Sequence, residues 1–233
     1  MSVREAASTA ARWLRERLAA LTWVHRALLV GALLTLGWMH WMEPGFRNRI
    51  VYDGLFMLVG PLVLAITHRE HIGWNVNRRA IRNTVLLSLF VVPFYVVGST
   101  MPSIRRFYPM WETSPSPEAF IPHALGLFFL ALATETYYRG LLCVGVKDIG
   151  FKAVFISPLL YMFHHRGKPW VEFLLSGPTD VLFGAVDYKS DSILPSVVAH
   201  GAGLVLLDWL VMHDPLWPET VTVAYLEWLP FPI

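Results

Sequence analysis

Charged residues are scarce in this chain. They make up 15% of its 233 residues, whereas soluble globular proteins average about 25%. Hydrophobic residues reach 55%, ten residues are Trp, and the mean hydropathy is +0.48. This much apolar material excludes a disordered chain, and a chain of this length cannot bury it in one water-soluble core. The composition therefore predicts a polytopic membrane protein.

The chain also contains few cysteines and has a small net charge. A single cysteine, Cys143, excludes an internal disulfide, and the sequence contains no HExxH or Cys-rich metal signature. The formal net charge of +2 is too small to indicate nucleic-acid binding. These absences leave the apolar segments and the few ionisable residues among them as the informative features.

Apolar segments that could cross a bilayer alternate with short polar or Pro-rich segments. A spanning helix needs about 20 apolar residues, with about 17 to 25 tolerated. We therefore expect an all-α, polytopic membrane helix bundle of about seven transmembrane helices. The predicted spans are residues 27–42, 50–67, 84–101, 119–146, 151–165, 170–186 and 193–212.

The first 26 residues are rich in Arg and Ala. Residues 3–20 include Glu5 and Glu16, and no A-x-A cleavage site follows the first apolar stretch. We therefore expect an interfacial helix that leads into an uncleaved first span, rather than a targeting peptide. Arg residues cluster in segments 4–26 and 69–82, and Lys and Arg favour the cytoplasmic side of a membrane. This bias predicts a cytoplasmic N-terminus.

Two charged residues lie within the fourth predicted span. A charge at membrane depth costs about 2.5 to 3.5 kcal/mol, so each one needs a physical reason. Glu135 and Arg139 are four residues apart with the acid first, which is the favourable order for a helical ion pair. The pair could do no more than neutralise itself and lock the helix.

Two histidines change that interpretation. If the fourth and fifth spans turn near Gly150, Glu135 and His165 lie at the same depth, roughly 20 Å from the turn at about 1.5 Å per residue. Tyr161 lies one helical turn before His165, and His200 lies in the last span. One carboxylate and two histidines suit activation of water and stabilisation of an oxyanion. The same trio could also bind a divalent metal, because imidazole and carboxylate are common zinc ligands.

These residues stand in three ordered motifs that resemble the CAAX protease and bacteriocin-processing (CPBP, or Abi) family of intramembrane proteases. The first family motif, E-E-x-x-x-R-G, corresponds to residues 134–140, TETYYRG. The second, F-x-x-x-H, corresponds to residues 161–165, YMFHH. The third, a His that follows a stretch like G-S-L-x-P-x-I-x-A, corresponds to residues 191–200, DSILPSVVAH. The similarity covers residues 119–212.

The resemblance implies an intramembrane endopeptidase whose better-understood relatives remove a tripeptide after a prenylated Cys. It implies that Glu135 and His165 activate water and that His200 holds the oxyanion, with Arg139 and Tyr161 in supporting positions. No metal ligand and no cofactor are expected. The expected partners are a membrane-anchored protein or peptide and the lipid bilayer, in a bacterial inner membrane, without nucleic acid.

The resemblance also divides the chain, within one membrane domain. Residues 1–118 supply the N-terminal interfacial helix and three spans. Residues 119–212 supply the CPBP-like catalytic core helices. Residues 213–233 form a Pro-rich tail that we expect at the membrane interface.

Two positions depart from the family pattern. Thr134 stands where the family has the first Glu of its doublet, and Leu204 stands where it has Asn. Either Glu135 serves as the base or the site is altered, in which case the chain is a membrane scaffold or an immunity-type protein. Asp180 and Asp208 are the acids that we expect could compensate.

A third hypothesis is that the protein is a transporter in which Glu135 and Arg139 form a proton relay. The sequence shows no inverted repeat of broken helices to support it.

Overall fold

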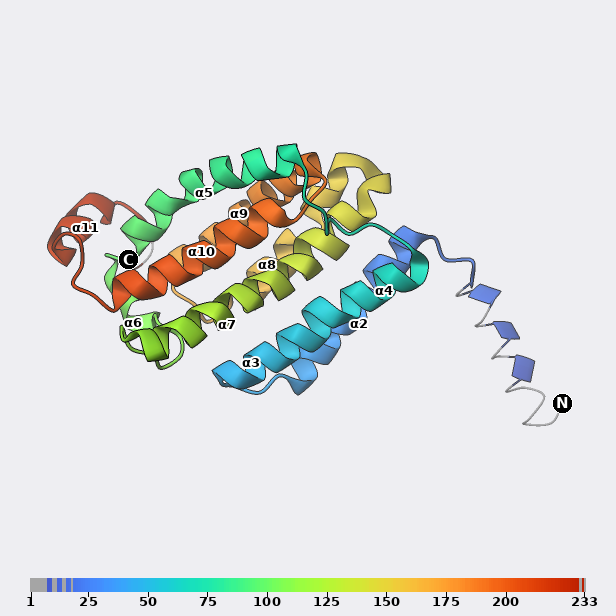
Figure 1. The fold of residues 1–233 in the computed structure, drawn as a ribbon, viewed down its shortest axis with the longest axis horizontal. Coiled ribbons are helices and arrows are strands. Elements are labelled where there is room, and N and C mark those ends of the chain that lie inside the picture. Colours follow the sequence, from blue (N-terminus) through green and yellow to red (C-terminus); the bar gives the residue numbers. More distant parts are fainter. Residues whose placement is uncertain (1–7, 10–11, 14–15, 18, 231, 233) are drawn as a thin grey trace.

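The computed structural model describes residues 8–9, 12–13, 16–17, 19–230 and 232, and within them it contains helices and connecting turns but no strand (Figure 1). The all-helical prediction is therefore confirmed for this part of the chain. The predicted interfacial helix over residues 3–20 falls partly on residues 3–7, 10–11, 14–15 and 18, which lie outside the described residues.

The helices differ widely in length. The α-helices are α2 (Trp23–Trp41), α3 (Phe46–Asp53), α4 (Gly60–His68), α5 (Arg78–Gly98), α6 (Pro102–Phe107), α7 (Pro117–Glu135), α8 (Pro158–His164), α9 (Trp170–Ser190), α10 (Leu194–Val211) and α11 (Glu219–Leu226). Two π-helical segments, η1 (Gly54–Val59) and η2 (Thr136–Leu141), continue α3 and α7, and a 3₁₀ segment, η3 (Val144–Phe155), follows η2.

Four helical stretches of the described chain are long and apolar enough to cross a membrane. They are Phe46–His68, Arg78–Gly98, Pro117–Leu141 and Leu194–Val211. Four of the seven predicted spans therefore have such a helix, and the count of seven is not confirmed. The sixth predicted span lies within α9, which is long but carries Glu172, Asp180, Asp187 and Lys189.

The fifth predicted span, residues 151–165, is wrong as a continuous helix. Its first part belongs to the 3₁₀ segment η3, which ends at Phe155, and its second part is the seven-residue helix α8. Pro158 explains the break, because proline has no backbone N–H to donate and restricts the residue before it. Pro158 instead takes the first position of α8, where no donor is needed.

Helix α10 lies between α5 and α7 and packs against both, and α9 packs against α8, η3 and α10. In Figure 1, α5, α10 and α7 run side by side, and α3 and α4 continue this layer beyond α7. The outer faces of the helices are apolar: Leu33, Val63, Ile66 and Leu89 are all more than half exposed. A surface of this kind needs lipid around it. Together with the spanning helices, it identifies an integral membrane protein.

Both π-helical segments begin directly after a carboxylate with no solvent exposure. Asp53 precedes η1 and Glu135 precedes η2. Asp53 accepts hydrogen bonds from Trp38 Nε1 at 2.7 Å and from Arg49 Nε at 2.8 Å. Short π segments inside α-helices are rare and frequently occur at functional sites, which directs attention to the residues around η2.

Candidate active site

A cluster of three charged side chains lies at the start of η2. Arg139 Nε is 2.9 Å from Glu135 Oε2, and Arg139 Nη1 is 2.8 Å from Asp180 Oδ1. All three residues are fully buried. The guanidinium also lies over the ring of Tyr161, 4.4 Å from its centroid. The predicted ion pair between Glu135 and Arg139 is confirmed, and through Asp180 it joins η2 to α9.

His200 on α10 makes a hydrogen bond to the same glutamate. Its Nδ1 is 2.7 Å from Glu135 Oε1. Because a carboxylate accepts, Nδ1 is the donor, and Nε2 is the ring nitrogen left for other partners. Glu135 thus has one oxygen toward Arg139 and the other toward His200.

His165 follows α8 and is oriented by its own helix. Its Nδ1 donates to the carbonyl of Tyr161 at 2.9 Å, and its ring lies 4.5 Å from the Tyr161 ring, centroid to centroid. Sequence reasoning placed Glu135, His165 and His200 together, and the structure shows a direct contact of Glu135 with His200. The assumption of continuous α-helices between Glu135 and His165 does not hold, because η2 is π-helical and η3 is 3₁₀, so the rise is not a constant 1.5 Å per residue.

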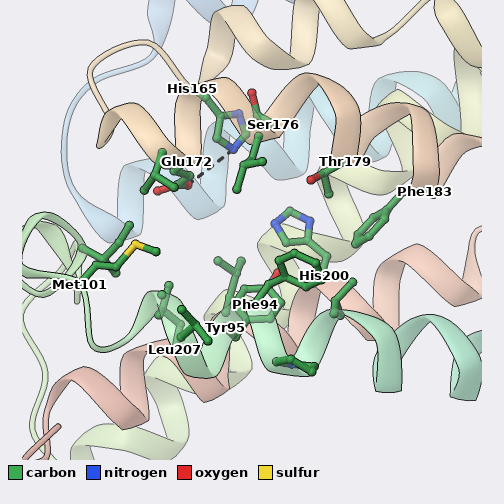
Figure 2. Close-up of a pocket in the computed structure, with 18 of the residues that line it drawn as sticks. Phe94, Tyr95, Met101, His165, Glu172, Ser176, Thr179, Phe183, His200 and Leu207 are labelled. Carbon is green, nitrogen blue, oxygen red and sulfur yellow. Dashed lines mark ion pairs between the residues drawn. The ribbon is translucent and has the colours of Figure 1, made fainter. Parts of the chain in front are cut away.

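The two histidines line one cavity of about 440 Å³ between α5, α9 and α10. Figure 2 shows His165 and His200 reaching it from different sides, with Glu172 beside His165. The walls are mainly apolar and include Phe94, Tyr95, Met101, Tyr161, Phe183 and Leu207. Glu135 is not part of the wall and reaches the cavity only through its hydrogen bond to His200.

Residues 116–205 match the protein-family model described as type II CAAX prenyl endopeptidase Rce1-like. This segment is similar to the Rce1-like family. The match confirms the predicted resemblance to the CAAX proteases, and the matched residues include Glu135, Arg139, Tyr161, His165 and His200. No curated protein and no solved structure matches the chain.

Within the Rce1-like segment, the two departures from the family motifs lie beside the histidines. Thr134 and Leu204 line a second cavity of about 110 Å³, and His165 and His200 contribute to its wall as well. The Thr134 hydroxyl donates to the carbonyl of Leu130 at 2.9 Å. Neither Thr134 nor Leu204 carries a carboxylate or an amide, so other residues must supply those groups if the site needs them.

Glu172, a residue of the Rce1-like segment that sequence reasoning missed, supplies a carboxylate to the larger cavity. It lies in the first turn of α9, and its Oε1 is 3.7 Å from His165 Nε2. The single proton of the Tyr108 hydroxyl is shared between the two carboxylate oxygens of Glu172, which lie 2.8 and 2.9 Å from the hydroxyl oxygen, and Lys168 Nζ lies 2.5 Å from Oε1. The sequence signal that could have indicated Glu172 was its position four residues after Lys168, which favours an ion pair on one helix face, a short distance after His165.

Tyr108 remains a donor in this arrangement. It is buried on the segment after α6, outside the spanning helices. Burial, and after it the charge of the Glu172 carboxylate, raise the pKa of Tyr108 well above its ordinary value. Its hydroxyl proton is therefore retained and continues to fix the Glu172 carboxylate.

The acids that were expected to compensate face elsewhere. Asp180 accepts from Ser157 Oγ at 2.6 Å besides pairing with Arg139, and Asp208 is 2.6 Å from His123 Nε2. Neither aspartate lines either of the two cavities. In the part of the chain that the structure describes, no group of three or more His, Cys, Asp or Glu is arranged to hold a metal ion.

Proposed function

We propose that the chain is an intramembrane endopeptidase that hydrolyses a peptide bond in a membrane-anchored peptide or a protein's C-terminal tail. One observation carries this proposal: His165 and His200 line the same, mainly apolar cavity of a helical bundle whose residues 116–205 match the Rce1-like family model. The cavity volume, about 440 Å³, lies within the range of about 300–1,000 Å³ that is usual for sites binding small ligands.

His200 is the residue that stabilises the oxyanion in this proposal. Glu135 fixes its Nδ1 as a donor, which orients Nε2 and stabilises the imidazolium when His200 holds a proton. Glu135 then acts through His200, and Arg139 and Tyr161 keep Glu135 in place. Preorganised charge aimed at a developing oxyanion contributes strongly to the rates of acyl-transfer enzymes.

His165 is the residue that contacts the attacking water. Its Nδ1 is engaged by the Tyr161 carbonyl, so the Nε2 of the neutral ring carries a lone pair that can accept a hydrogen bond from the water and orient it. The apolar walls suit a lipid-like anchor or apolar side chains close to the scissile bond. This chemistry needs neither a nucleophilic side chain nor a cofactor.

The test uses the full chain, purified and reconstituted in liposomes. The substrates are a farnesylated peptide with a C-terminal CAAX sequence and a peptide with a transmembrane anchor and a free C-terminal tail, and mass spectrometry identifies the products. We expect one of them to be cleaved by the wild type, and His165→Ala and His200→Ala to abolish cleavage. His40→Ala, at an exposed histidine of α2, is the matched control. Absence of cleavage, or unchanged cleavage by both cavity variants, would refute the proposal.

A non-catalytic membrane scaffold of the same fold is the second candidate, favoured by Thr134 and Leu204 in place of Glu and Asn. It predicts no cleavage of either peptide. If cleavage occurs but a chelator stops it and Zn²⁺ restores it, the metal-free chemistry is refuted instead.

We further propose that the N-terminus is cytoplasmic, in a bacterial inner membrane, on the strength of the Arg clusters before α2 and before α5. A reporter active only in the cytoplasm, fused to the N-terminus, would be inactive if this orientation were wrong.

A further inference from the structure

Two hydrogen-bond acceptors face each other at the edge of the larger cavity. Because the Nδ1–H of His165 donates to the Tyr161 carbonyl, its Nε2 is an acceptor in the neutral ring. The nearest oxygen of Glu172 lies 3.7 Å from that nitrogen, and a carboxylate is also an acceptor. Two acceptors cannot bond directly, but one water molecule about 2.8 Å from each can donate a proton to both.

Glu172 is held in this position from two sides. The Tyr108 hydroxyl contacts both carboxylate oxygens, and Lys168 Nζ contacts Oε1. Its side chain keeps 21% of its surface exposed, so it remains open to the cavity. Glu135 has no exposed surface and both its oxygens face Arg139 or His200. Among the described residues that line the larger cavity, Glu172 is the one carboxylate.

His200 lies across the cavity from this pair. Figure 2 places His165 and Glu172 next to each other, joined by a dashed line, and His200 apart from them across the open space. A peptide carbonyl between the two sides would meet water on one side and an imidazole on the other. This is the arrangement that hydrolysis by an activated water requires.

We propose that Glu172, together with His165, is the catalytic base of this chain. This inference rests on the proposed peptidase function and names the carboxylate of that same site. The water, held by a hydrogen bond to His165 Nε2, gives one proton to Glu172, and its oxygen forms a bond to the scissile carbonyl carbon. The resulting oxyanion is stabilised by His200. The C–N bond then breaks, the amine leaving group takes the proton from Glu172, and the products are a carboxylic acid and an amine.

The test compares Glu172→Gln and Glu172→Ala with the wild type in the liposome assay. A positioned general base contributes about 10²- to 10⁴-fold, so we expect Glu172→Gln to lower kcat by about that factor while KM changes little. Adding sodium formate should restore at least part of the activity of Glu172→Ala, because a small carboxylate can enter the space left beside Lys168. Glu118→Gln, the same change at an exposed glutamate of α7, should leave cleavage unchanged.

A purely structural Glu172 would behave differently. An acid in the first turn of α9 also stabilises that helix terminus, and Glu172→Asp would serve that role equally well. For a base, the shortened side chain withdraws the carboxylate from His165, so Glu172→Asp should retain only part of the activity while its melting temperature matches the wild type. Cleavage by Glu172→Gln at the wild-type rate, full activity of Glu172→Asp, or no rescue by formate would each overturn this inference while leaving the peptidase proposal intact. Absence of cleavage by the wild type would overturn both.

Discussion

Replacing Arg139 by methionine removes the guanidinium that two buried carboxylates share. Arg139 lies 2.9 Å from Glu135 and 2.8 Å from Asp180, and all three side chains have no exposed surface. Removing one partner of a buried ion pair costs about 3–5 kcal/mol, because the other charge is left without a counterion. Each kcal/mol lowers the Tm of a chain of 150–250 residues by about 2–4 °C. We therefore expect Arg139→Met to lower the Tm by roughly 6–20 °C.

Thermal unfolding in detergent micelles, followed by the fluorescence of the ten Trp residues, measures this shift. The triple variant Arg139→Met/Glu135→Gln/Asp180→Asn removes all three charges, so no carboxylate is left without a counterion. It should recover at least half of the lost Tm, although each further substitution would be destabilising alone. Arg106→Met, at an exposed arginine of α6, is the control and should change the Tm little.

Two results would refute this reasoning. A Tm for Arg139→Met within about 2 °C of the wild type, equivalent to less than about 1 kcal/mol, would mean that the cluster does not hold η2 against α9. A triple variant that melts lower than Arg139→Met would mean that uncompensated carboxylates are not the cause of the loss.

Three further predictions concern the cavities and the membrane. Leu204→Asn places an amide beside His200, so it should raise kcat in the peptide assay if an oxyanion forms there, and an unchanged kcat would count against that position. Thr134→Glu is tested in the Glu172→Gln background and should restore cleavage, because position 134 shares the wall of the smaller cavity with His200. If cleavage is not restored, the carboxylate must lie at position 172. Leu89→Arg puts a charge on the exposed face of α5 and should make the free energy of membrane insertion less favourable by about 2.5–3.5 kcal/mol. The inserted fraction measures this change, and an unchanged fraction would show that this face does not contact lipid.

The sequence predicted the features that depend on local spacing. Glu135 and Arg139, four residues apart, form the expected ion pair, since neighbours on one helix turn meet wherever the helix lies. The long apolar segments became helices such as α5 and α10 that could cross a membrane. Both results depend on residues close together in the sequence, so they could be predicted without knowing how the helices pack.

Features that depend on an unbroken helix were not predictable in this way. The expected meeting of Glu135 with His165 required constant helical geometry between them, and η2 and η3 interrupt it. Glu172 was overlooked because its importance comes from Tyr108, a residue 64 positions earlier in the chain. No spacing rule reports such a contact. The roles of His165 and His200 in cleavage stay predictions that the alanine variants above test.

The π-helical segment η2 makes the site depend on the number of residues in one helical turn. Glu135 lies immediately before it and Arg139 lies within it. A π turn contains more residues than an α turn, so deleting one residue between 136 and 141 would allow an ordinary α-helix to form. Because the π turn holds one residue more than an α turn, the deletion would leave the residues outside η2 facing nearly the same way, but a deletion before Arg139 would shorten the spacing from Glu135 to Arg139 from four residues to three. We therefore expect deletion of residue 140 or 141 to spare both contacts of Glu135, and deletion of residue 136, 137 or 138 to disturb the ion pair with Arg139, so the place of the extra residue in this turn matters to the site.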